Sequence, residues 1–212
     1  MTFLSGDILV KIKRKGVFFI LSSPSGGGKT TLRDEILKRY PAIKYSVSYT
    51  TRKPRPGDVN GRDYHFVDKE EFKKLVKEDK FLEYAEVHSN SYGTGKEILK
   101  ELDKGFDVLL DIDVQGGETI KKNFKDAVLL FILPPSWKIL ENRLRSRNTD
   151  AKDVIEKRLE GAKKEIERLF NYDYLLVNDT IDSMVTMFQD IYVSEKNKTL
   201  RLEVDWNDFY SY

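Results

Sequence analysis

A glycine-rich segment of the sequence has the residues and the spacing of a phosphate-binding loop. Residues 22–32 read Ser-Ser-Pro-Ser-Gly-Gly-Gly-Lys-Thr-Thr-Leu. Glycines let backbone N–H groups approach phosphate oxygens without Cβ atoms in the way, and the positive end of a following helix faces the anion. The lysine supplies a charge near the β- and γ-phosphates, and the next threonine a hydroxyl for Mg²⁺. The segment therefore predicts a site for a nucleoside triphosphate that includes Ser23, Pro24, Ser25, Gly26, Gly27, Gly28, Lys29, Thr30 and Thr31.

The flanking residues place this loop at a turn from a strand to a helix. An apolar run, 17–21, precedes the loop and an amphipathic run follows it. That context disfavours the alternative of a flexible turn followed by an ordinary surface lysine. The usual pattern, G-x-x-x-x-G-K-[ST], has glycine at its first position, where this chain has Ser23. We expect Ser23 to be tolerated because three consecutive glycines still allow close approach of the backbone.

A second group of cations lies in a loop with two prolines and two glycines. Arg52, Lys53, Arg55 and Arg62 fall within eleven residues. A solvated basic loop is the simplest interpretation, but the chain as a whole is nearly neutral, with 37 Lys and Arg against 35 Asp and Glu. The small net charge gives no general reason to expect nucleic acid or an anionic membrane as a partner. The loop therefore predicts a local anion site.

Two carboxylates end an apolar run at residues 107–113. This run reads as a buried parallel strand, and Asp111 and Asp113 come at its carboxyl end, which is the edge where α/β proteins bind ligands. Asp111 has the position at which many phosphate-loop enzymes hold Mg²⁺ through water. It could instead orient the loop, and both interpretations stay open.

The composition excludes several other classes of site. The chain has no cysteine and two histidines, so disulfides, thiolate catalysis and zinc sites are not expected, whereas Mg²⁺ bound by oxygen atoms is compatible. The sequence contains no run of about 18 apolar residues, so no membrane span is predicted. Residues 1–15 carry their charges after the short apolar piece, unlike a secretory signal. We expect a cytoplasmic protein with a short N-terminal extension.

Periodicity predicts alternating strands and helices, and hence an α/β fold with a parallel core sheet. The expected strands cover 17–22, 43–49, 64–67, 81–87, 107–113, 127–133 and 172–177. The expected helices cover 30–39, 69–79, 94–104, 136–147, 151–169 and 181–195. Thr94 and Glu97 could form a capping box at the start of the third helix. Residues 196–212 contain no motif.

Five motifs in register resemble guanylate kinase over about residues 15–191. They are the phosphate loop, Tyr-Thr-Thr-Arg-Lys-Pro-Arg at 49–55, Val-Asn-Gly-Arg-Asp-Tyr at 59–64, Tyr-Gly-Thr at 92–94 and Asp-Ile-Asp-Val-Gln-Gly at 111–116. The resemblance implies Mg²⁺-dependent transfer of the γ-phosphoryl group of ATP to GMP or dGMP, giving ADP and GDP or dGDP, in purine nucleotide metabolism. It also implies a three-layer phosphate-loop kinase fold with a core (15–47, 105–135 and 170–195), a GMP-binding α+β insertion (48–104), a helical lid (136–169) and terminal extensions (1–14 and 196–212).

The same resemblance assigns the acceptor nucleotide to particular residues. A guanine site needs a carboxylate for the N1–H and amino donors and hydroxyl donors for O6, and a bound phosphate needs fixed cations. The implied GMP contacts are Ser48, Arg52, Arg55, Tyr64, Glu83, Tyr92, Thr94 and Asp113. Four of them have a simpler alternative: Thr94 as a helix cap, Glu83 as a solvated strand residue, and Tyr64 and Tyr92 as packing aromatics.

For phosphoryl transfer the resemblance implies Lys29, Arg52 and the lid arginines Arg143, Arg147 and Arg158 as catalytic residues, with Asn178 near the adenine end of ATP. A solvent-exposed position is the alternative for each lid arginine.

A catalytically inactive guanylate-kinase-like interaction module is the competing hypothesis. The complete phosphate loop, with Lys29 and Thr30 in place, disfavours it. Glu83 and the hydroxyls of Ser48 and Thr94 disfavour a kinase for another nucleoside monophosphate. The sequence does not indicate an oligomeric state.

Overall fold

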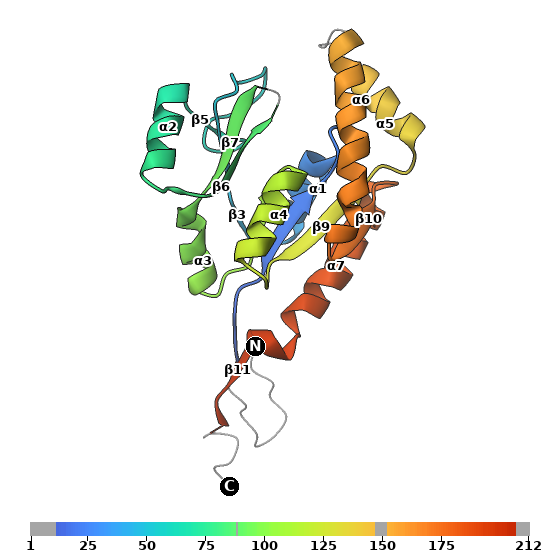
Figure 1. The fold of residues 1–212 in the computed structure, drawn as a ribbon. Helices are drawn as coiled ribbons and strands as arrows, with labels where there is room; N and C mark the ends of the chain where they lie inside the picture. The colour runs from blue at the N-terminus through green and yellow to red at the C-terminus, as the bar shows by residue number, and fades with distance from the viewer. Residues whose placement is uncertain (1–11, 88, 147–151, 207–212) are drawn as a thin grey trace.

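The computed structural model describes residues 12–87, 89–146 and 152–206 of the 212-residue chain (Figure 1). The strands are β1 (Ile12–Arg14), β2 (Phe18–Ser22), β3 (Lys44–Tyr45), β4 (Tyr49–Thr50), β5 (His65–Phe66), β6 (Phe81–Val87), β7 (Asn90–Gly95), β8 (Val108–Asp111), β9 (Val128–Leu133), β10 (Tyr174–Val177) and β11 (Leu202–Val204). The α-helices are α1 (Lys29–Arg39), α2 (Lys69–Lys77), α3 (Leu99–Asp103), α4 (Val114–Asn123), α5 (Trp137–Arg145), α6 (Lys152–Ile166) and α7 (Ile181–Lys196).

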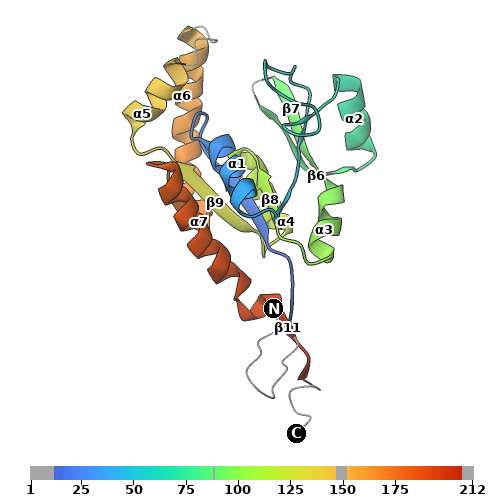
Figure 2. The same ribbon diagram turned by 180° about the vertical axis from the view of Figure 1, so that it is seen from behind.

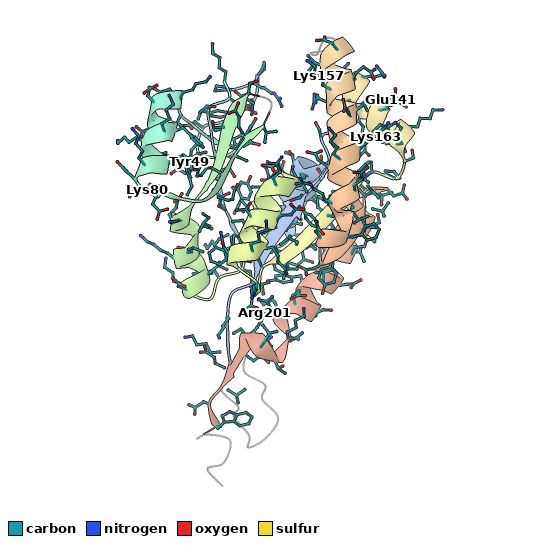
Figure 3. The ribbon with its side chains drawn as sticks, in the orientation of Figure 1. Tyr49, Lys80, Glu141, Lys157, Lys163 and Arg201 are labelled. Carbon is teal, nitrogen blue, oxygen red and sulfur yellow. The ribbon has the colours of Figure 1, made fainter. Side chains whose placement is uncertain are left out.

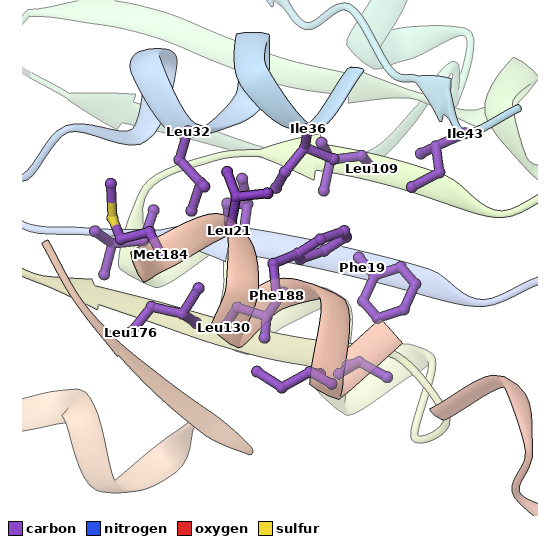
Figure 4. Packing of buried hydrophobic residues seen from close by; sticks show 14 of the residues in the cluster. Phe19, Leu21, Leu32, Ile36, Ile43, Leu109, Leu130, Leu176, Met184 and Phe188 are labelled. Carbon is purple, nitrogen blue, oxygen red and sulfur yellow. The ribbon is translucent and has the colours of Figure 1, made fainter. Parts of the chain in front are cut away.

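The core is a parallel sheet of five strands in the order β10-β9-β2-β8-β3, covered by helices on both faces. Strand β2 lies at its centre, and every residue of this strand is buried. Side chains alternate along a strand, so Phe19 and Leu21 pack with α1 and α7 (Figure 4), while Phe18 and Ile20 pack with α4 on the other face. This arrangement confirms the predicted α/β fold with a parallel core sheet.

A second sheet, in the order β5-β4-β7-β6, stands beside the core. Helix α2 covers it, and the rings of Phe72 and Phe81 stack with their centroids 4.8 Å apart. Both ribbon views show this sheet with α2 on one side of α1, and the pair α5 and α6 on the other (Figures 1 and 2). The phosphate loop between β2 and α1 therefore has the second sheet on one side and the α5–α6 pair on the other.

Several predicted element boundaries are wrong. The strand expected at 43–49 is two short strands that belong to different sheets, β3 and β4. Thr94 lies in β7 instead of starting a helix, and the next helical turn is capped by Gly95 without a side-chain hydrogen bond, so the predicted capping box does not form. Strand β7 and helix α4 have no counterpart among the expected elements. Glycine lowers the intrinsic propensity for both, so pairing with β6 and packing against the core decide these two segments.

The two ends of the described chain pair with each other. Strands β1 and β11 form an antiparallel ribbon, and Arg14 NH1 donates to the Lys196 carbonyl oxygen at 2.7 Å. Arg201, labelled beside the end of α7 in Figure 3, donates from NH2 to the buried Glu195 carboxylate at 3.0 Å. Within the residues that the structure describes, no helix has the length and apolar character needed to cross a bilayer.

Candidate active site

The phosphate loop has the backbone conformation that its glycines allow. Gly26 and Gly28 have φ values of 84° and 100°, in the left-handed region that residues with a Cβ rarely adopt. A Cβ on Gly28 would also lie 2.2 Å from Asn178 Nδ2. Gly28 is the N-cap of α1 and Lys29 is its first residue, so the positive end of the helix faces the loop.

Ser23, which replaces the first glycine of the usual pattern, fits because Gly27 has no side chain. A Cβ on Gly27 would lie 2.6 Å from the Ser23 Cβ. The Ser23 hydroxyl donates to the Pro24 carbonyl oxygen at 3.0 Å, and the Gly27 N–H donates to the same oxygen at 2.8 Å. The serine therefore stabilises the turn without blocking the approach of the backbone to an anion.

One pocket of about 290 Å³ brings the loop together with side chains from the second sheet and from α6. It is lined by Ser23, Pro24, Ser25, Gly26, Gly27, Gly28, Lys29, Thr30, Thr31, Ser48, Arg55, Tyr64, Glu83, Val87, Tyr92, Gly93, Asp111, Ile112, Asp113, Arg158 and Glu165. Most of the sequence-predicted site residues, which are far apart in the chain, are therefore in a single cavity.

The second-sheet side of the pocket presents hydroxyl groups and a cation. The Ser48 hydroxyl is buried and has no hydrogen-bond partner within the described protein. Such atoms are rare, because burial without a partner costs free energy, so this hydroxyl is suited to a ligand. Burial, followed by the nearby Asp111 carboxylate, raises the pKa of Tyr64 to about 12, which keeps its hydroxyl a donor at neutral pH. Arg55 is exposed at the same edge.

Glu83 is a buried carboxylate that faces the pocket from β6. Its Oε1 accepts a hydrogen bond from the Thr94 hydroxyl at 2.6 Å. Thr94 therefore lies behind Glu83 and does not line the pocket itself. Burial, with a smaller contribution from the Asp113 carboxylate, raises the pKa of Glu83 to about 7, although the Thr94 hydroxyl bond acts in the opposite direction. Asp113 also caps α4, accepting from the Gln115 N–H at 2.8 Å.

Two further predicted residues lie behind the pocket wall. The Arg52 guanidinium donates to the Asp58 carboxylate at 2.9 Å and lies over the Tyr64 ring, 5.2 Å from its centroid. It thereby braces a tyrosine that does line the pocket. Asn178 stabilises the phosphate loop, because its Nδ2 donates to the Gly27 carbonyl oxygen at 2.7 Å.

The predicted lid arginines differ in their surroundings. Arg158 on α6 reaches the loop and donates from Nε and NH2 to the Ser25 hydroxyl at 3.1 and 2.7 Å. Arg143 on α5 has NH1 4.0 Å from the position of a Cβ on Gly28. Arg147 lies outside the described residues.

Glu165 on α6 is a pocket residue that the sequence analysis did not single out. Its Oε2 accepts a hydrogen bond from the Ser25 N–H at 3.2 Å. The carboxylate thus uses one of the loop N–H groups that suit a phosphate oxygen. In a helix as charged as α6, no sequence signal distinguishes this glutamate from its solvated neighbours.

The oxygen atoms in the pocket are of the kind that Mg²⁺ prefers. Thr30, in the first turn of α1, and Asp111, at the end of β8, both line the pocket. Asp111 Oδ1 accepts from the Tyr45 hydroxyl at 2.5 Å, and Oδ2 lies 3.7 Å from Arg33 NH1. No cluster of three or more metal-binding side chains occurs among the described residues. The residues fit an ion that brings most of its ligands as phosphate oxygens and water, which is the usual case for Mg²⁺.

The chain is similar to proteins of one family over nearly all of its length. The guanylate kinase family model matches residues 15–196. The guanylate kinase of Rickettsia prowazekii is 49% identical over 190 residues, which cover 89% of this chain and 96% of the relative. That of Geobacter metallireducens is 45% identical over 192 residues, covering 90% and 95%. The crystal structure of guanylate kinase from Anaplasma phagocytophilum superposes with a TM-score of 0.76 at 37% identity, covering 90% of this chain and 92% of that one.

Proposed function

Because this chain belongs to the guanylate kinase family and is an enzyme of that family, we propose that it transfers the γ-phosphoryl group of ATP to GMP. The observation that carries the proposal is the single pocket lined by both the phosphate loop and the second sheet. Phosphoryl transfer depends chiefly on holding donor and acceptor in line in one site. We include dGMP as a second acceptor and a role in purine nucleotide metabolism in the same proposal.

We assign ATP to the phosphate-loop side of the pocket. The loop N–H groups and Lys29 bind the phosphates, and Asn178 lies toward the adenine end. Thr30 and Asp111 would hold the Mg²⁺ that accompanies ATP. Bound there, the ion would neutralise charge on the transferred phosphoryl group.

We assign GMP to the second-sheet side of the pocket. Glu83 accepts hydrogen bonds from the guanine N1–H and amino group, with Ser48, Asp113 and, through its bond to Glu83, Thr94 completing the base site. The phosphate of GMP is bound by Arg55 and the hydroxyls of Tyr64 and Tyr92, with Arg52 bracing Tyr64. The unpartnered hydroxyl of Ser48 and the short bond from Thr94 to Glu83 support this assignment.

We further propose that residues 48–104 act as a GMP-binding insertion and residues 136–169 as a lid on the core. The lid arginines Arg143, Arg147 and Arg158 would stabilise charge as the phosphoryl group moves. The contact of Arg158 with Ser25 supports this, because it already brings a lid cation to the phosphate loop. The complete phosphate loop gives no support to an inactive interaction module.

A panel of acceptors tests the proposed function. Purified protein with ATP and Mg²⁺ should form ADP far faster with GMP than with AMP, CMP or UMP, because none of the other bases presents a ring N–H and an amino group side by side to the Glu83 carboxylate. A coupled assay of ADP formation measures the four rates. Equal rates across the panel, or no reaction with GMP, would remove the assignment.

The raised pKa of Glu83 predicts a pH dependence for the acceptor. Only the ionised carboxylate accepts both guanine donors, and a group with a pKa of about 7 is ionised to roughly one tenth at pH 6 and nine tenths at pH 8. We therefore expect kcat/KM for GMP to rise about tenfold over this range. The pH profile of Glu83→Gln should still show the ionisation of the GMP phosphate. It should not show the rise in kcat/KM that comes from ionisation of Glu83. Parallel profiles for the two proteins would contradict the prediction.

A further inference from the structure

Arg33 is a buried charge on the first helix after the phosphate loop. It lies in α1 one turn beyond Lys29, and its side chain is only 8% exposed. A buried guanidinium is stable only when charged or polar partners surround it. The origin of those partners therefore shows what Arg33 holds together.

One set of partners links Arg33 to the core. Arg33 NH1 donates to the Tyr45 hydroxyl at 3.0 Å, and that hydroxyl donates in turn to Asp111 Oδ1 at 2.5 Å. Arg33 NH1 also lies 3.7 Å from Asp111 Oδ2. Strand β3, strand β8 and helix α1 thus meet at one guanidinium. The Asp111 carboxylate, which lines the pocket, has one oxygen bonded to Tyr45 and the other facing Arg33.

The other partners are Asp34 on the same helix and Asp63 in the basic loop. Arg33 NH2 lies 2.7 Å from Asp34 Oδ1 and 3.7 Å from Asp63 Oδ1. The second oxygen of Asp63 accepts from the Val59 N–H at 2.8 Å and from Arg62. Asp63 therefore closes the turn of the basic loop and faces the helix with its remaining oxygen.

Asp63 directly precedes Tyr64, which lines the pocket. The ion pair between Arg33 and Asp63 consequently spans the two halves of the site, from the helix that carries Lys29 to the loop that carries Arg55 and ends at Tyr64. A planar fork can contact separate partners at fixed angles, which a lysine ammonium on a flexible stem cannot do.

We propose that Arg33 is a positioning residue that sets the distance between the donor and acceptor sides of the pocket. It does so by pairing with Asp63 on the acceptor loop while bonded to Tyr45 and Asp111 on the core. This inference rests on the proposed function, since it assigns the basic loop to the acceptor nucleotide. Arg33 does not line the pocket, so its effect passes through the residues it holds.

The test compares Arg33→Met and Arg33→Lys with Arg39→Met. Arg39 is on the same helix and is also paired with two carboxylates, Glu35 and Asp182, both at 2.7 Å, but it lies on the outer surface. For Arg33→Met we expect KM for GMP to rise about tenfold and kcat to fall by a similar factor, because small misplacements of reacting groups cost up to roughly 10²-fold in rate. KM for ATP should change less, by about twofold, because the Tyr45 hydroxyl still donates to Asp111 in this variant. Arg33→Lys should lie between wild type and Arg33→Met, and Arg39→Met should match wild type.

A purely structural role for Arg33 predicts a different pattern. It would lower the melting temperature and the active fraction of protein but leave KM for GMP unchanged in the folded molecules. That pattern would overturn the positioning role of Arg33. The proposed function would still stand, because it is tested by the rate of the wild-type protein with GMP. Loss of GMP activity in the wild type itself would overturn both.

A double-mutant cycle keeps the test decisive if Arg33→Met does not fold. Asp63→Asn and Arg33→Lys weaken the same contact from its two ends, so combining them tests whether the two residues act through it. We expect the double variant to raise KM for GMP no more than the worse single variant. Multiplication of the two single effects would show that the residues act independently and would overturn the inference.

Discussion

Replacing Lys29 with alanine is expected to lower kcat on the order of 10³-fold, because one preorganised charge at a transferring phosphoryl group contributes on this scale. Lys29 is the first residue of α1 and lines the pocket beside the loop glycines. Its ammonium is the cation that the loop places near the β- and γ-phosphates. The loss should therefore be in kcat, measured as ADP formation at saturating ATP and GMP.

Affinity for GMP should be almost unchanged in Lys29→Ala, because the acceptor contacts come from the second sheet. Calorimetric titration with GMP in the absence of ATP measures this. Lys38→Ala is the matched control, since Lys38 is an exposed lysine on the same helix. A variant that folds but loses GMP affinity along with activity would contradict the division of the pocket into two subsites.

Replacing Glu83 with glutamine is expected to lower kcat/KM for GMP by roughly 10³-fold, since a site built to accept hydrogen bonds discriminates strongly once its polar groups are mismatched. The change puts an amide N–H₂ in place of one carboxylate oxygen, so at least one guanine donor meets another donor. The side-chain volume is nearly unchanged. The hydrogen bond from the Thr94 hydroxyl can also be retained, because the amide oxygen still accepts it. Kinetics with GMP as the varied substrate measure the loss.

Glu86→Gln provides the matched control for this variant. Glu86 is on the same strand, β6, but its side chain is exposed, and its replacement should leave kcat/KM for GMP unchanged. The affinity of Glu83→Gln for ATP should also equal that of wild type. A loss of less than about tenfold would mean that Glu83 is not the main reader of the base, whose recognition would then fall to Ser48 and Asp113.

The strongly periodic parts of the fold could be predicted from the sequence. The apolar runs that became β2, β8 and β9 are buried on both faces, so their composition alone marks them as central strands of a parallel sheet. Segments with weak patterns could not be predicted. Strand β7 contains two glycines and polar residues, and it is a strand because it pairs with β6 on one side and β4 on the other.

The burial of Arg33 shows the same limit at the site. Arg33 falls next to Leu32 and at helical spacing from Ile36 and Leu37, so a charge within the apolar stripe was the available signal. Its partners Tyr45, Asp63 and Asp111 are far apart in sequence. Thr94 is a comparable case, since its hydroxyl bonds to Glu83 across two strands instead of capping a helix.

By itself the sequence determined the phosphate loop, because the glycines, Lys29 and Thr30 act through backbone geometry over a few consecutive residues. It also determined the α/β class and the family resemblance. Only the tertiary structure decided that Ser48, Glu83 and Tyr92 share one pocket with the loop, and that Asp63 and Asp111 meet at Arg33. The physical reason is that local propensity and periodicity act over one helix or strand, whereas burial, ion pairing and a raised pKa depend on which distant segments exclude water together.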